Sequence, residues 1–463
     1  MPDAFDETTD RRAFIKQTAA AGAGLGLAGS ALAAPAVRAA GGSPAERVTV
    51  AVMGVNSRGN ALAKSFAKTP DARVAYIADV DERAVDKTVA DVAEIQDRPP
   101  EGVEDFRRAL DDADVNALAT AAPDHWHAPA ALMALDAGKH VYVEKPCSHN
   151  PREGEMLVAA QKKYPDQVIQ MGNQQRSAPR SQEIVERIRS GDVIGDAYYG
   201  RAYYNRNRGP TNLKRPAEVP DWLNYDLWQG PVPNKPYAEN LIHYNWHWFW
   251  HWGTGEICNN GTHEIDVCRW ALDVDYPTRA ASNGGRYAYD DDWEAFDTQV
   301  AGFDFAGEKS IAWDGRSSSS TPPRGGSGPG SGGRGAAIHG TEGTVLIDRS
   351  GYAVHDMEGE LVEKSVRGDG QIDQTNIRGG GGMTDRHTTN FVRAIRGEAE
   401  PHSPIGEARK SVLLCHLGNI AQRRKMEVDV DPETGRPRGE EAMQLWSRTY
   451  APQWQEKLMA AAR

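Results

Sequence analysis

Cysteine is scarce in this sequence, and basic residues are fewer than acidic ones. Four cysteines occur in 463 residues, and no two of them form a Cys-x-x-Cys pair. Such sparse cysteines do not build a disulfide scaffold. Lysine and arginine number 53 against 65 aspartates and glutamates, which gives a net charge of −12. A protein that binds a nucleic acid backbone needs a basic face, so this balance argues against nucleic acid as a partner.

Long apolar runs are also rare, and the one candidate lies near the N-terminus. Residues 18–34 are small and apolar, and they follow Arg11-Arg12-Ala13-Phe14-Ile15-Lys16. This twin-arginine pattern predicts export by the Tat machinery, a transient partner. The segment is short for a membrane span, so we expect removal after Ala33 or Ala39, with an uncleaved anchor as the alternative. We assign residues 1–46 to signal peptide and linker, and predict a periplasmic or secreted protein with no stable membrane insertion after removal.

A glycine-containing turn follows the first apolar run beyond that segment. Residues 48–53 lead into Gly54-Val55-Asn56-Ser57-Arg58-Gly59. A pyrophosphate sits on a helix N-terminus only if the preceding turn is tight and free of bulky side chains, and Gly54 and Gly59 meet that need. Asn56 replaces the middle glycine and adds a side chain where a cofactor approaches. The turn predicts a dinucleotide site; an ordinary strand-to-helix turn without a ligand is the alternative.

An acidic residue at the end of the next apolar run bears on the choice of cofactor. Residues 74–78 end in Asp79, twenty positions beyond Gly59. A carboxylate there accepts hydrogen bonds from a ribose 2′-hydroxyl and repels a 2′-phosphate. We therefore expect NAD, with NADP as the less favoured cofactor.

Strand-like and helix-like segments alternate through the first part of the chain, which is typical of a parallel sheet covered by helices. Strand patterns cover residues 47–53, 73–78, 115–121, 140–143 and 168–171. Helix patterns cover residues 57–68, 82–93, 127–137, 151–163 and 181–190. We expect a Rossmann dinucleotide-binding domain over residues 47–172.

The pattern changes near residue 194 to short alternating strands. They cover residues 197–205, 280–287, 298–305, 309–314, 336–339, 344–348 and 352–355. Helices are expected at 384–395, 405–423 and 440–459, and glycine-rich loops at 317–335 and 379–382. The predicted fold class is thus α/β, with the Rossmann domain followed over residues 173–463 by an α+β domain that has a large, mostly antiparallel open sheet.

A lysine lies at the tip of a later strand of the first sheet. Glu144-Lys145-Pro146 ends the run 140–143. Carboxyl ends of parallel strands meet at one edge of a sheet, so this position places an ammonium group beside the expected cofactor. We predict that Lys145 is catalytic.

Several motifs, taken in order, resemble the Gfo/Idh/MocA oxidoreductase family. They are the G-x-N-x-x-G turn, Glu144-Lys145-Pro146, Pro123-Asp124-His125-Trp126-His127, Gln170-Met171-Gly172-Asn173-Gln174-Gln175-Arg176, Gly253-Thr254-Gly255-Glu256 with His263, and Gly340-Thr341-Glu342-Gly343. The resemblance covers almost the whole chain beyond the signal segment. It implies activity on sugars or cyclitols, a substrate and oligomerisation domain whose open sheet often forms homo-oligomers, catalysis by Lys145, and often a cis bond before Pro146.

The resemblance also implies an aspartate and a histidine four residues apart, and Asn259 and His263 stand at those places. Spacing of four puts both side chains on one helical face, so they can address one substrate. Asn259 can orient a hydroxyl group but cannot relay a proton, which leaves Lys145 and His263 as acid and base. The alternative for His263 is a packed histidine that only orients Asn259. The positive nicotinamide ring would lower the pKa of Lys145.

The residues expected to contact the cofactor lie in the glycine turn and at the strand tips. They are Gly54, Asn56, Ser57, Arg58, Gly59, Asp79, Pro123, His125, His127, Glu144, Lys145 and Asn173.

Residues 245–252 hold four of the twelve tryptophans. In a strand the four indoles share one face and can stack on a sugar; an aromatic core or an oligomer contact is the alternative. In a helix, His243, His247 and His251 would fall at intervals of four with Glu256 nearby, but the spacing matches no recognised zinc motif, and we predict no metal. The candidate substrate-binding residues are Arg176, Trp222, Tyr225, Trp246, His247 and Trp248.

Export and NAD together constrain the reaction, because no free nicotinamide pool is expected outside the cytoplasm. We therefore predict an exported NAD(P)-dependent oxidoreductase that acts on a sugar, glycoside or cyclitol by hydride transfer with a tightly held cofactor. One alternative is an NAD-dependent glycoside hydrolase that works through transient oxidation and elimination. Another is a non-catalytic sugar-binding module that keeps NAD only as a folding element.

Overall fold

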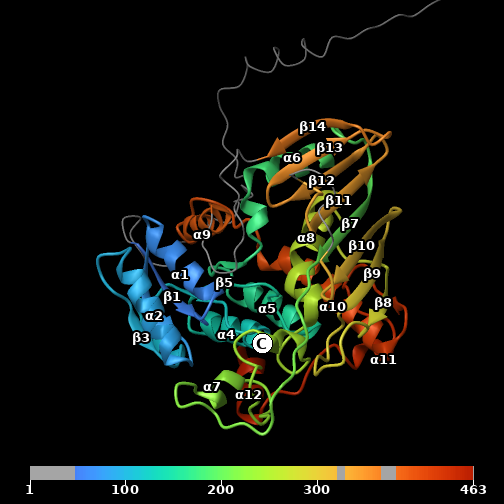
Figure 1. Ribbon diagram of the computed structural model, residues 1–463. Coiled ribbons are helices and arrows are strands. Elements are labelled where there is room, and N and C mark those ends of the chain that lie inside the picture. The colour runs from blue at the N-terminus through green and yellow to red at the C-terminus, as the bar shows by residue number, and fades with distance from the viewer. Residues whose placement is uncertain (1–46, 321–328, 367–381, 462–463) are drawn as a thin grey trace, which may run out of the picture. The chain divides into compact units, whose positions relative to one another are not determined.

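Two β-sheets organise the part of the chain that this computed structural model describes, which is residues 47–320, 329–366 and 382–461 (Figure 1). The predicted signal segment lies outside these residues, as do parts of both predicted loops. Within the described residues, no helix is sufficiently long and apolar to span a membrane.

The first sheet is parallel, as expected for a Rossmann domain. Over the described residues its strand order is β3-β2-β1-β4-β5-β6, and each neighbouring pair is parallel. The strands are β1 (Val48–Met53), β2 (Ala72–Ala78), β3 (Glu101–Val103), β4 (Ala117–Thr120), β5 (His140–Val143) and β6 (Ile169–Met171). Every residue of β1 is buried, because helices cover both faces of the sheet. The order reverses between β1 and β4, and such a switch point opens a crevice at the carboxyl ends of the strands.

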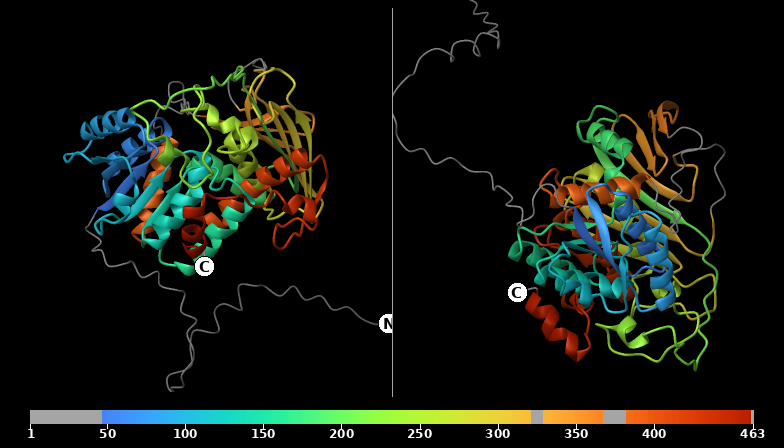
Figure 2. Two further views of the ribbon diagram at one scale, coloured as in Figure 1. Left: turned by 90° about the horizontal axis from the view of Figure 1, so that it is seen from below. Right: turned by 90° about the vertical axis from the view of Figure 1, so that its left-hand side faces the viewer.

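Each face of this sheet has its own set of helices (Figures 1 and 2). One core joins the sheet to α1 (Arg58–Lys68), α2 (Glu82–Ala93) and α9 (Gly382–Ile395). The other core joins it to α4 (Asp124–Asp136), α5 (Pro151–Lys163), α10 (Ile405–Arg424) and α12 (Pro452–Ala461). Two C-terminal helices and α9 thus complete the N-terminal domain.

Local sequence sets where several of these helices begin. The Asp81 side chain accepts a hydrogen bond from the Arg83 amide at the start of α2, and Asn150 accepts one from Glu153 at the start of α5. Pro151 occupies the first turn of α5, where a missing N–H costs nothing. These signals explain why the predicted and observed starts of α2 and α5 agree.

The second sheet is mostly antiparallel, which confirms the predicted α+β domain. Its order in the described residues is β14-β13-β12-β11-β7-β10-β9-β8-β15, and only β7 and β10 pair in parallel. The strands are β7 (Ala197–Asn205), β8 (Arg279–Gly285), β9 (Thr298–Phe305), β10 (Lys309–Arg316), β11 (Arg334–Gly340), β12 (Thr344–Asp348), β13 (Gly351–His355), β14 (Leu361–Val366) and β15 (Val428–Asp429). Its core includes side chains from α6 (Pro179–Arg189), α8 (Thr262–Leu272) and α10.

Short helical elements connect the longer ones. They are α3 (Arg107–Leu110), η2 (Gln174–Ser177), α7 (Tyr225–Gln229), η3 (Asn245–Trp248), η4 (Ile257–Gly261) and α11 (Glu440–Met443).

Two sequence-based expectations were wrong. The helix predicted over 440–459 is broken: α11 ends at Met443, and α12 begins at Pro452, which has no N–H with which to continue an earlier helix. The aromatic segment 245–252 forms neither a strand nor a long helix, but the short 3-10 turn η3 followed by further turns. Its period-two pattern of tryptophans therefore does not reflect a strand.

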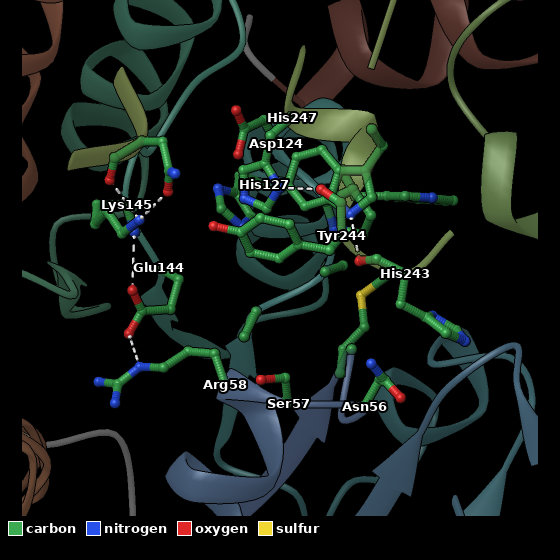
Figure 3. A pocket seen from close by; sticks show the side chains of 18 of the residues that line it. Asn56, Ser57, Arg58, Asp124, His127, Glu144, Lys145, His243, Tyr244 and His247 are labelled. Carbon is green, nitrogen blue, oxygen red and sulfur yellow. Dashed lines mark hydrogen bonds and ion pairs between the residues drawn. The ribbon is translucent and has the colours of Figure 1, made fainter. Parts of the chain in front are cut away.

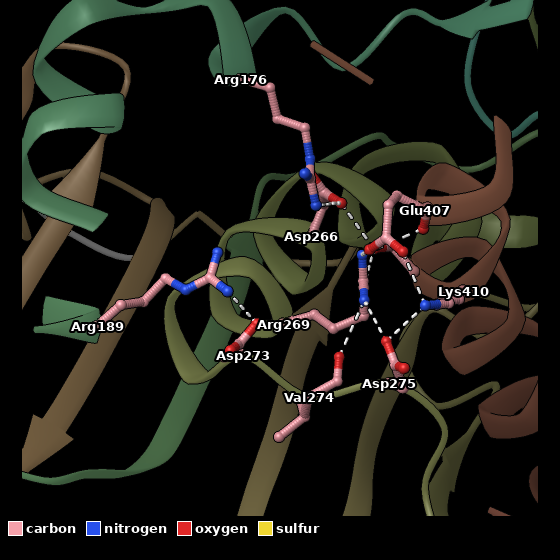
Figure 4. A network of polar contacts seen from close by, with 10 residues as sticks. Arg176, Arg189, Asp266, Arg269, Asp273, Val274, Asp275, Glu407 and Lys410 are labelled. Atoms are coloured by element: carbon pink, nitrogen blue, oxygen red, sulfur yellow. Dashed lines mark hydrogen bonds and ion pairs between the residues drawn. The ribbon is translucent and has the colours of Figure 1, made fainter. Parts of the chain in front are cut away.

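A buried ionic network joins the segment after the first sheet to the second domain (Figure 4). Arg176 in η2 donates two hydrogen bonds to Asp266 in α8, at 2.7 and 2.9 Å, and Ser411 in α10 donates a third at 2.6 Å. Both charged side chains are under a tenth exposed. Burial alone would raise the pKa of Asp266, but the Arg176 charge and these hydrogen bonds outweigh it and hold that pKa below its ordinary value.

We expect Asp266→Asn to lower the free energy of unfolding by about 3 kcal/mol or more, because it leaves the buried Arg176 without its counter-charge. Urea unfolding at neutral pH measures this loss. Asp273→Asn is the matched control: Asp273 pairs with Arg189 at the surface, so we expect a loss under about 1 kcal/mol. Equal, small losses in both variants would contradict the assigned role of the network.

Candidate functional site

One pocket lies where the carboxyl edge of the first sheet faces η4 and α8 of the second domain (Figure 3). The residues that follow β1, β4 and β5 form one wall. The opposite wall comes from β7, the aromatic segment, η4 and α8. The pocket therefore occupies the crevice that the strand order predicts.

The glycine turn leaves no room for side chains at its two ends. A Cβ on Gly54 would lie 2.3 Å from the Ala122 backbone nitrogen, and Gly54 has a φ of +81°. A Cβ on Gly59 would lie 2.2 Å from the Gly54 carbonyl oxygen. Gly59 is buried beneath the turn and does not line the pocket, so it acts through close packing.

The start of α1 fits a phosphate group. Asn56, Ser57 and Arg58 line the pocket, so the side chain of Asn56 forms part of the wall. Ser57 makes no side-chain cap on the first turn of α1, and that turn holds no acidic residue. Its first amide groups are thus left to an anion, as a dinucleotide diphosphate requires.

Asp79 holds the turn from the neighbouring strand. Its carboxylate accepts hydrogen bonds from the amides of Val55 at 2.6 Å and Asp81 at 3.1 Å. Burial raises its pKa, and the two amide hydrogen bonds oppose that effect. Asp79 lines the pocket, and its contact with a ribose stays a prediction.

Lys145 points across the pocket to the second domain. Its Nζ donates to the backbone oxygen of Asn259 at 2.7 Å and to the side-chain oxygen of Asn259 at 3.1 Å. The Lys145–Pro146 bond is cis, as the resemblance implied. Burial lowers the pKa of Lys145, although the charges of Glu144 and Asp124 oppose it. A lysine with a lowered pKa is a better proton acceptor near neutral pH.

Glu144 links this lysine to the glycine turn. Arg58 Nε donates to Glu144 at 2.7 Å, and Gln174 donates to the same oxygen at 2.9 Å (Figure 3). Burial would raise the pKa of Glu144, but the charges of Arg58 and Lys145 outweigh it, so the pKa is lowered and the carboxylate stays ionised. Glu144 thus fixes Arg58 and Lys145 on one wall.

Asn259 and His263 both reach the pocket, but not from one regular helix. Asn259 lies in the π-helical turn η4, and His263 lies in the first turn of α8. Burial, followed by the charges of Arg349 and Lys145, lowers the pKa of His263 well below its ordinary value. The imidazole is therefore neutral at physiological pH, and its burial beside these cations opposes its protonation. The catalytic roles of the three residues stay predictions.

The remaining predicted cofactor residues divide into two groups. Pro123 and His127 line the pocket, and His127 Nδ1 lies 2.6 Å from the Pro146 oxygen. His125 lies behind the wall, where its ring contacts the Trp228 oxygen at 2.9 Å and burial lowers its pKa to about 3. Asn173 is buried outside the pocket lining.

The candidate substrate residues divide in the same way. Trp246 and His247 line the pocket, with ring centroids 3.6 Å apart. The others lie outside that lining: Arg176 pairs with Asp266, Trp222 stacks under Arg83, Tyr225 stacks on Trp228, and Trp248 stacks on Trp293. Most of the aromatic segment is thus core, which was the alternative.

The histidines of this segment do not converge. His243 contacts Asp81 at 2.8 Å, whereas His247 and His251 contact the backbone oxygens of Tyr244 and Pro233. In the described part of the chain, no group of three or more potential ligands is placed to hold a metal ion.

Asp124 is a pocket residue that sequence reasoning missed. It is the first residue of α4, directly after Pro123, and is only 2% exposed. Burial raises its pKa to about 7. The hydrogen bond donated by Thr254 at 2.5 Å and the charge of Lys145 lower this pKa, but burial outweighs them. Asp124 lies between Pro123 and His127 in a motif from which both were predicted to contact the cofactor, and this position could have identified it.

Two family models match this chain. Residues 48–172 match the model described as "Oxidoreductase family, NAD-binding Rossmann fold", and residues 196–284 match "Oxidoreductase family, C-terminal alpha/beta domain". The chain carries both domains of the Gfo/Idh/MocA oxidoreductase family. The family assignment by sequence is thereby confirmed, as is NAD binding by the first domain.

Curated relatives of this family member carry a hydrolase name. A "Glycosyl hydrolase family 109 protein" of Saccharopolyspora erythraea is 32% identical over 209 residues, which is 42% of this chain and 45% of that protein. A "Glycosyl hydrolase family 109 protein 1" of Shewanella sp. (strain ANA-3) is 28% identical over 211 residues, again 42% of this chain and 45% of that protein. The match thus spans less than half of each relative.

Solved structures of other oxidoreductases share the fold over most of the chain. Levoglucosan dehydrogenase, in complex with NADH and levoglucosan, has a TM-score of 0.63 and 17% identity, and the match covers 83% of this chain and 99% of that one. The WlbA dehydrogenase from Bordetella pertussis, in complex with NADH and UDP-GlcNAcA, has a TM-score of 0.59 and 17% identity, with 83% and 98% covered.

Asp124 gives a testable pH dependence of stability. Its pKa is about 7 in the folded protein and near 4 in an unfolded chain, so the folded state retains the proton to a higher pH. Stability conferred by that proton is present at low pH and is lost as the pH rises from about 4 to about 7. We expect Asp124→Asn to gain stability relative to the wild type across this window, by at most about 4 kcal/mol.

Urea unfolding at a series of pH values measures the difference between the two proteins. Asp273→Asn, at the surface, serves as the control with no such trend. Parallel stability curves for Asp124→Asn and the wild type would contradict the raised pKa.

Proposed function

We propose that this protein is an NAD-dependent oxidoreductase that transfers hydride between a tightly held cofactor and a sugar, glycoside or cyclitol. One observation carries the proposal. The Lys145 ammonium, Asn259 and His263 line the same pocket as the glycine turn at the start of α1. The family models and the dehydrogenases that share the fold support this reading.

In this proposal, each group of pocket residues has a separate role. The start of α1 would hold the diphosphate, and Asp79 the ribose, of a bound NAD. NAD supplies the site that accepts or returns hydride. In the oxidative direction, neutral Lys145 accepts the substrate hydroxyl proton as the carbon gives up hydride, and Lys145 returns the proton in the reductive direction. His263, neutral at its lowered pKa, forms a hydrogen bond with the substrate hydroxyl, and Asn259 holds Lys145 in place.

The twin-arginine segment supports a further part of the proposal, export to the periplasm or beyond by the Tat machinery. An exported enzyme must regenerate its cofactor in place, by oxidising one sugar and reducing another. We also propose a homo-oligomer formed through the open second sheet, because much of one face of that sheet lies outside its helix-covered core.

A glycoside hydrolase that works through transient oxidation is the second candidate. The hydrolase name of the matched relatives favours it, although less than half of each relative is matched. So does Asp124, because elimination and addition of water require an acid–base group besides the one that accepts the hydroxyl proton, and its pKa of about 7 suits that work. In this candidate Lys145 performs the same initial oxidation.

We expect Lys145→Ala to lose turnover by about 100-fold or more, because the proton acceptor is removed, while NAD stays bound. Nucleotide extraction and turnover assays on protein purified without added cofactor measure both quantities. Lys87→Ala, at a surface ion pair with Asp91, is the matched control with full turnover. If Lys145→Ala changed only local stability and the wild type had no turnover, the non-catalytic sugar-binding module would hold instead.

The two enzyme candidates differ in the product formed from a nitrophenyl glycoside without added cofactor. With a ketose supplied as the second substrate, the oxidoreductase gives matched oxidation of the glycoside and reduction of the ketose, with no free aglycone. The hydrolase releases aglycone with no net redox change. Chromatography of sugars together with the absorbance of nitrophenol separates these outcomes, and release of aglycone by the wild type would overturn the first candidate.

A further inference from the structure

Glu256 is a buried negative charge directly behind Asn259. Five hydrogen bonds converge on its carboxylate. The donors are Arg208 Nε at 2.9 Å, Arg208 Nη2 at 3.1 Å, Ser317 Oγ at 3.0 Å, Asn259 Nδ2 at 3.2 Å and Asn260 Nδ2 at 2.5 Å. Burial would raise the pKa of Glu256, but the Arg208 charge and the hydrogen bonds outweigh it and lower that pKa, so Glu256 is ionised.

This carboxylate determines which way the Asn259 amide faces. A carboxylate only accepts hydrogen bonds, so it binds the NH₂ end of the amide, and an ammonium only donates, so it binds the oxygen end. Nδ2 of Asn259 accordingly lies 3.2 Å from Glu256, and Oδ1 lies 3.1 Å from Lys145 Nζ. With the amide reversed, both contacts would bring like partial charges together.

The orientation matters for the lysine. An ammonium carries three hydrogens, and within the described residues two of them go to Asn259. The third is left for an oxygen atom in the pocket. A reversed amide would remove one acceptor and push the ammonium away from this position.

We propose that Glu256 and Arg208 are positioning residues, which hold Lys145 in its reactive place through the amide of Asn259. This inference rests on the proposed oxidoreductase function. It explains why position 259 carries an amide: a carboxylate there would face Glu256 across 3.2 Å, and two like charges at that distance repel. An asparagine instead binds an ammonium on one side and a carboxylate on the other.

Charge from Glu256 also reaches Lys145 across the amide. The titratable groups that interact electrostatically with Glu256 are Arg208, Tyr244, His247 and Lys145. Those that interact with Lys145 are Glu144, Asp124, Arg349, Glu256, His127, His247 and His263. Among them Glu256 favours the charged form of Lys145. Removal of Glu256 therefore lowers the pKa of Lys145, and an added carboxylate beside Lys145 raises it.

The test is a double-mutant cycle of Glu256→Gln and Asn259→Asp in the full-length protein with its nucleotide bound. The readout is reduction of the bound cofactor by a panel of methyl glycosides and myo-inositol, as a function of pH. The rate rises with pH as Lys145 loses its proton, so a lower pKa moves this acid limb to lower pH.

We expect Glu256→Gln to shift the limb to lower pH and to slow the reaction about 10-fold, because an NH₂ group replaces one of the two oxygens that hold Arg208 and the Asn259 amide. Asn259→Asp should shift the limb to higher pH. The double variant places a single carboxylate next to Lys145, so its limb should lie between those of the single variants and its rate should exceed that of Glu256→Gln.

Asp266→Asn is the matched control, since it also breaks a buried pair of a carboxylate and an arginine but does not touch Asn259. It should lose stability with the acid limb unmoved. Additive losses in the double variant with an unshifted limb would overturn the positioning role. If Glu256→Gln does not fold, Asn259→Asp alone tests the proposal. An acid limb that stays unmoved in Asn259→Asp would also overturn the positioning role. Absence of cofactor reduction in the wild type would instead refute the proposed function.

Discussion

Lys145 carries a buried ammonium group, and the site is organised around the polar groups that stabilise its charge in place of water. Its ammonium lies at the tip of β5, but its two acceptors belong to one residue of the other domain. On its own side Glu144 supplies the nearest negative charge, and Arg58 in turn holds Glu144. A buried ammonium without such partners would cost several kcal/mol. The domains must therefore be held in register, which the pair of Arg176 and Asp266 helps to do.

The first sheet could be predicted from sequence because its strands are buried on both faces. Runs such as Val48 to Met53 are continuously apolar, and caps such as Asp81 and Asn150 mark the helices that follow. The edge strands β3 and β14 escaped prediction because few of their side chains are buried, so no apolar pattern marks them. Strand β9 was predicted because buried and more exposed residues alternate along its whole length, which leaves a period-two apolar pattern in the sequence.

The site was predictable only in part. Lys145, Asn259 and His263 were placed in one pocket from motif positions, and the structure brings them to one pocket. The aromatic segment was not predictable, because tryptophan at every second position fits a strand as well as a folded turn whose indoles fill a core. Asp124 and Glu256 were not assigned roles in the site, since burial and hydrogen-bond geometry, not residue type, give them significance.

The pocket lining runs from Met53 to Thr384, so the cavity is assembled from most of the chain. During synthesis the glycine turn is complete long before α8 and α9 leave the ribosome. A nascent chain can therefore offer a dinucleotide only an open platform, and the enclosing wall closes over it at the end of translation. Enclosure of the pocket is thus a property of the finished polypeptide, and a chain truncated ahead of α8 would lack His263 and every lining residue that follows it.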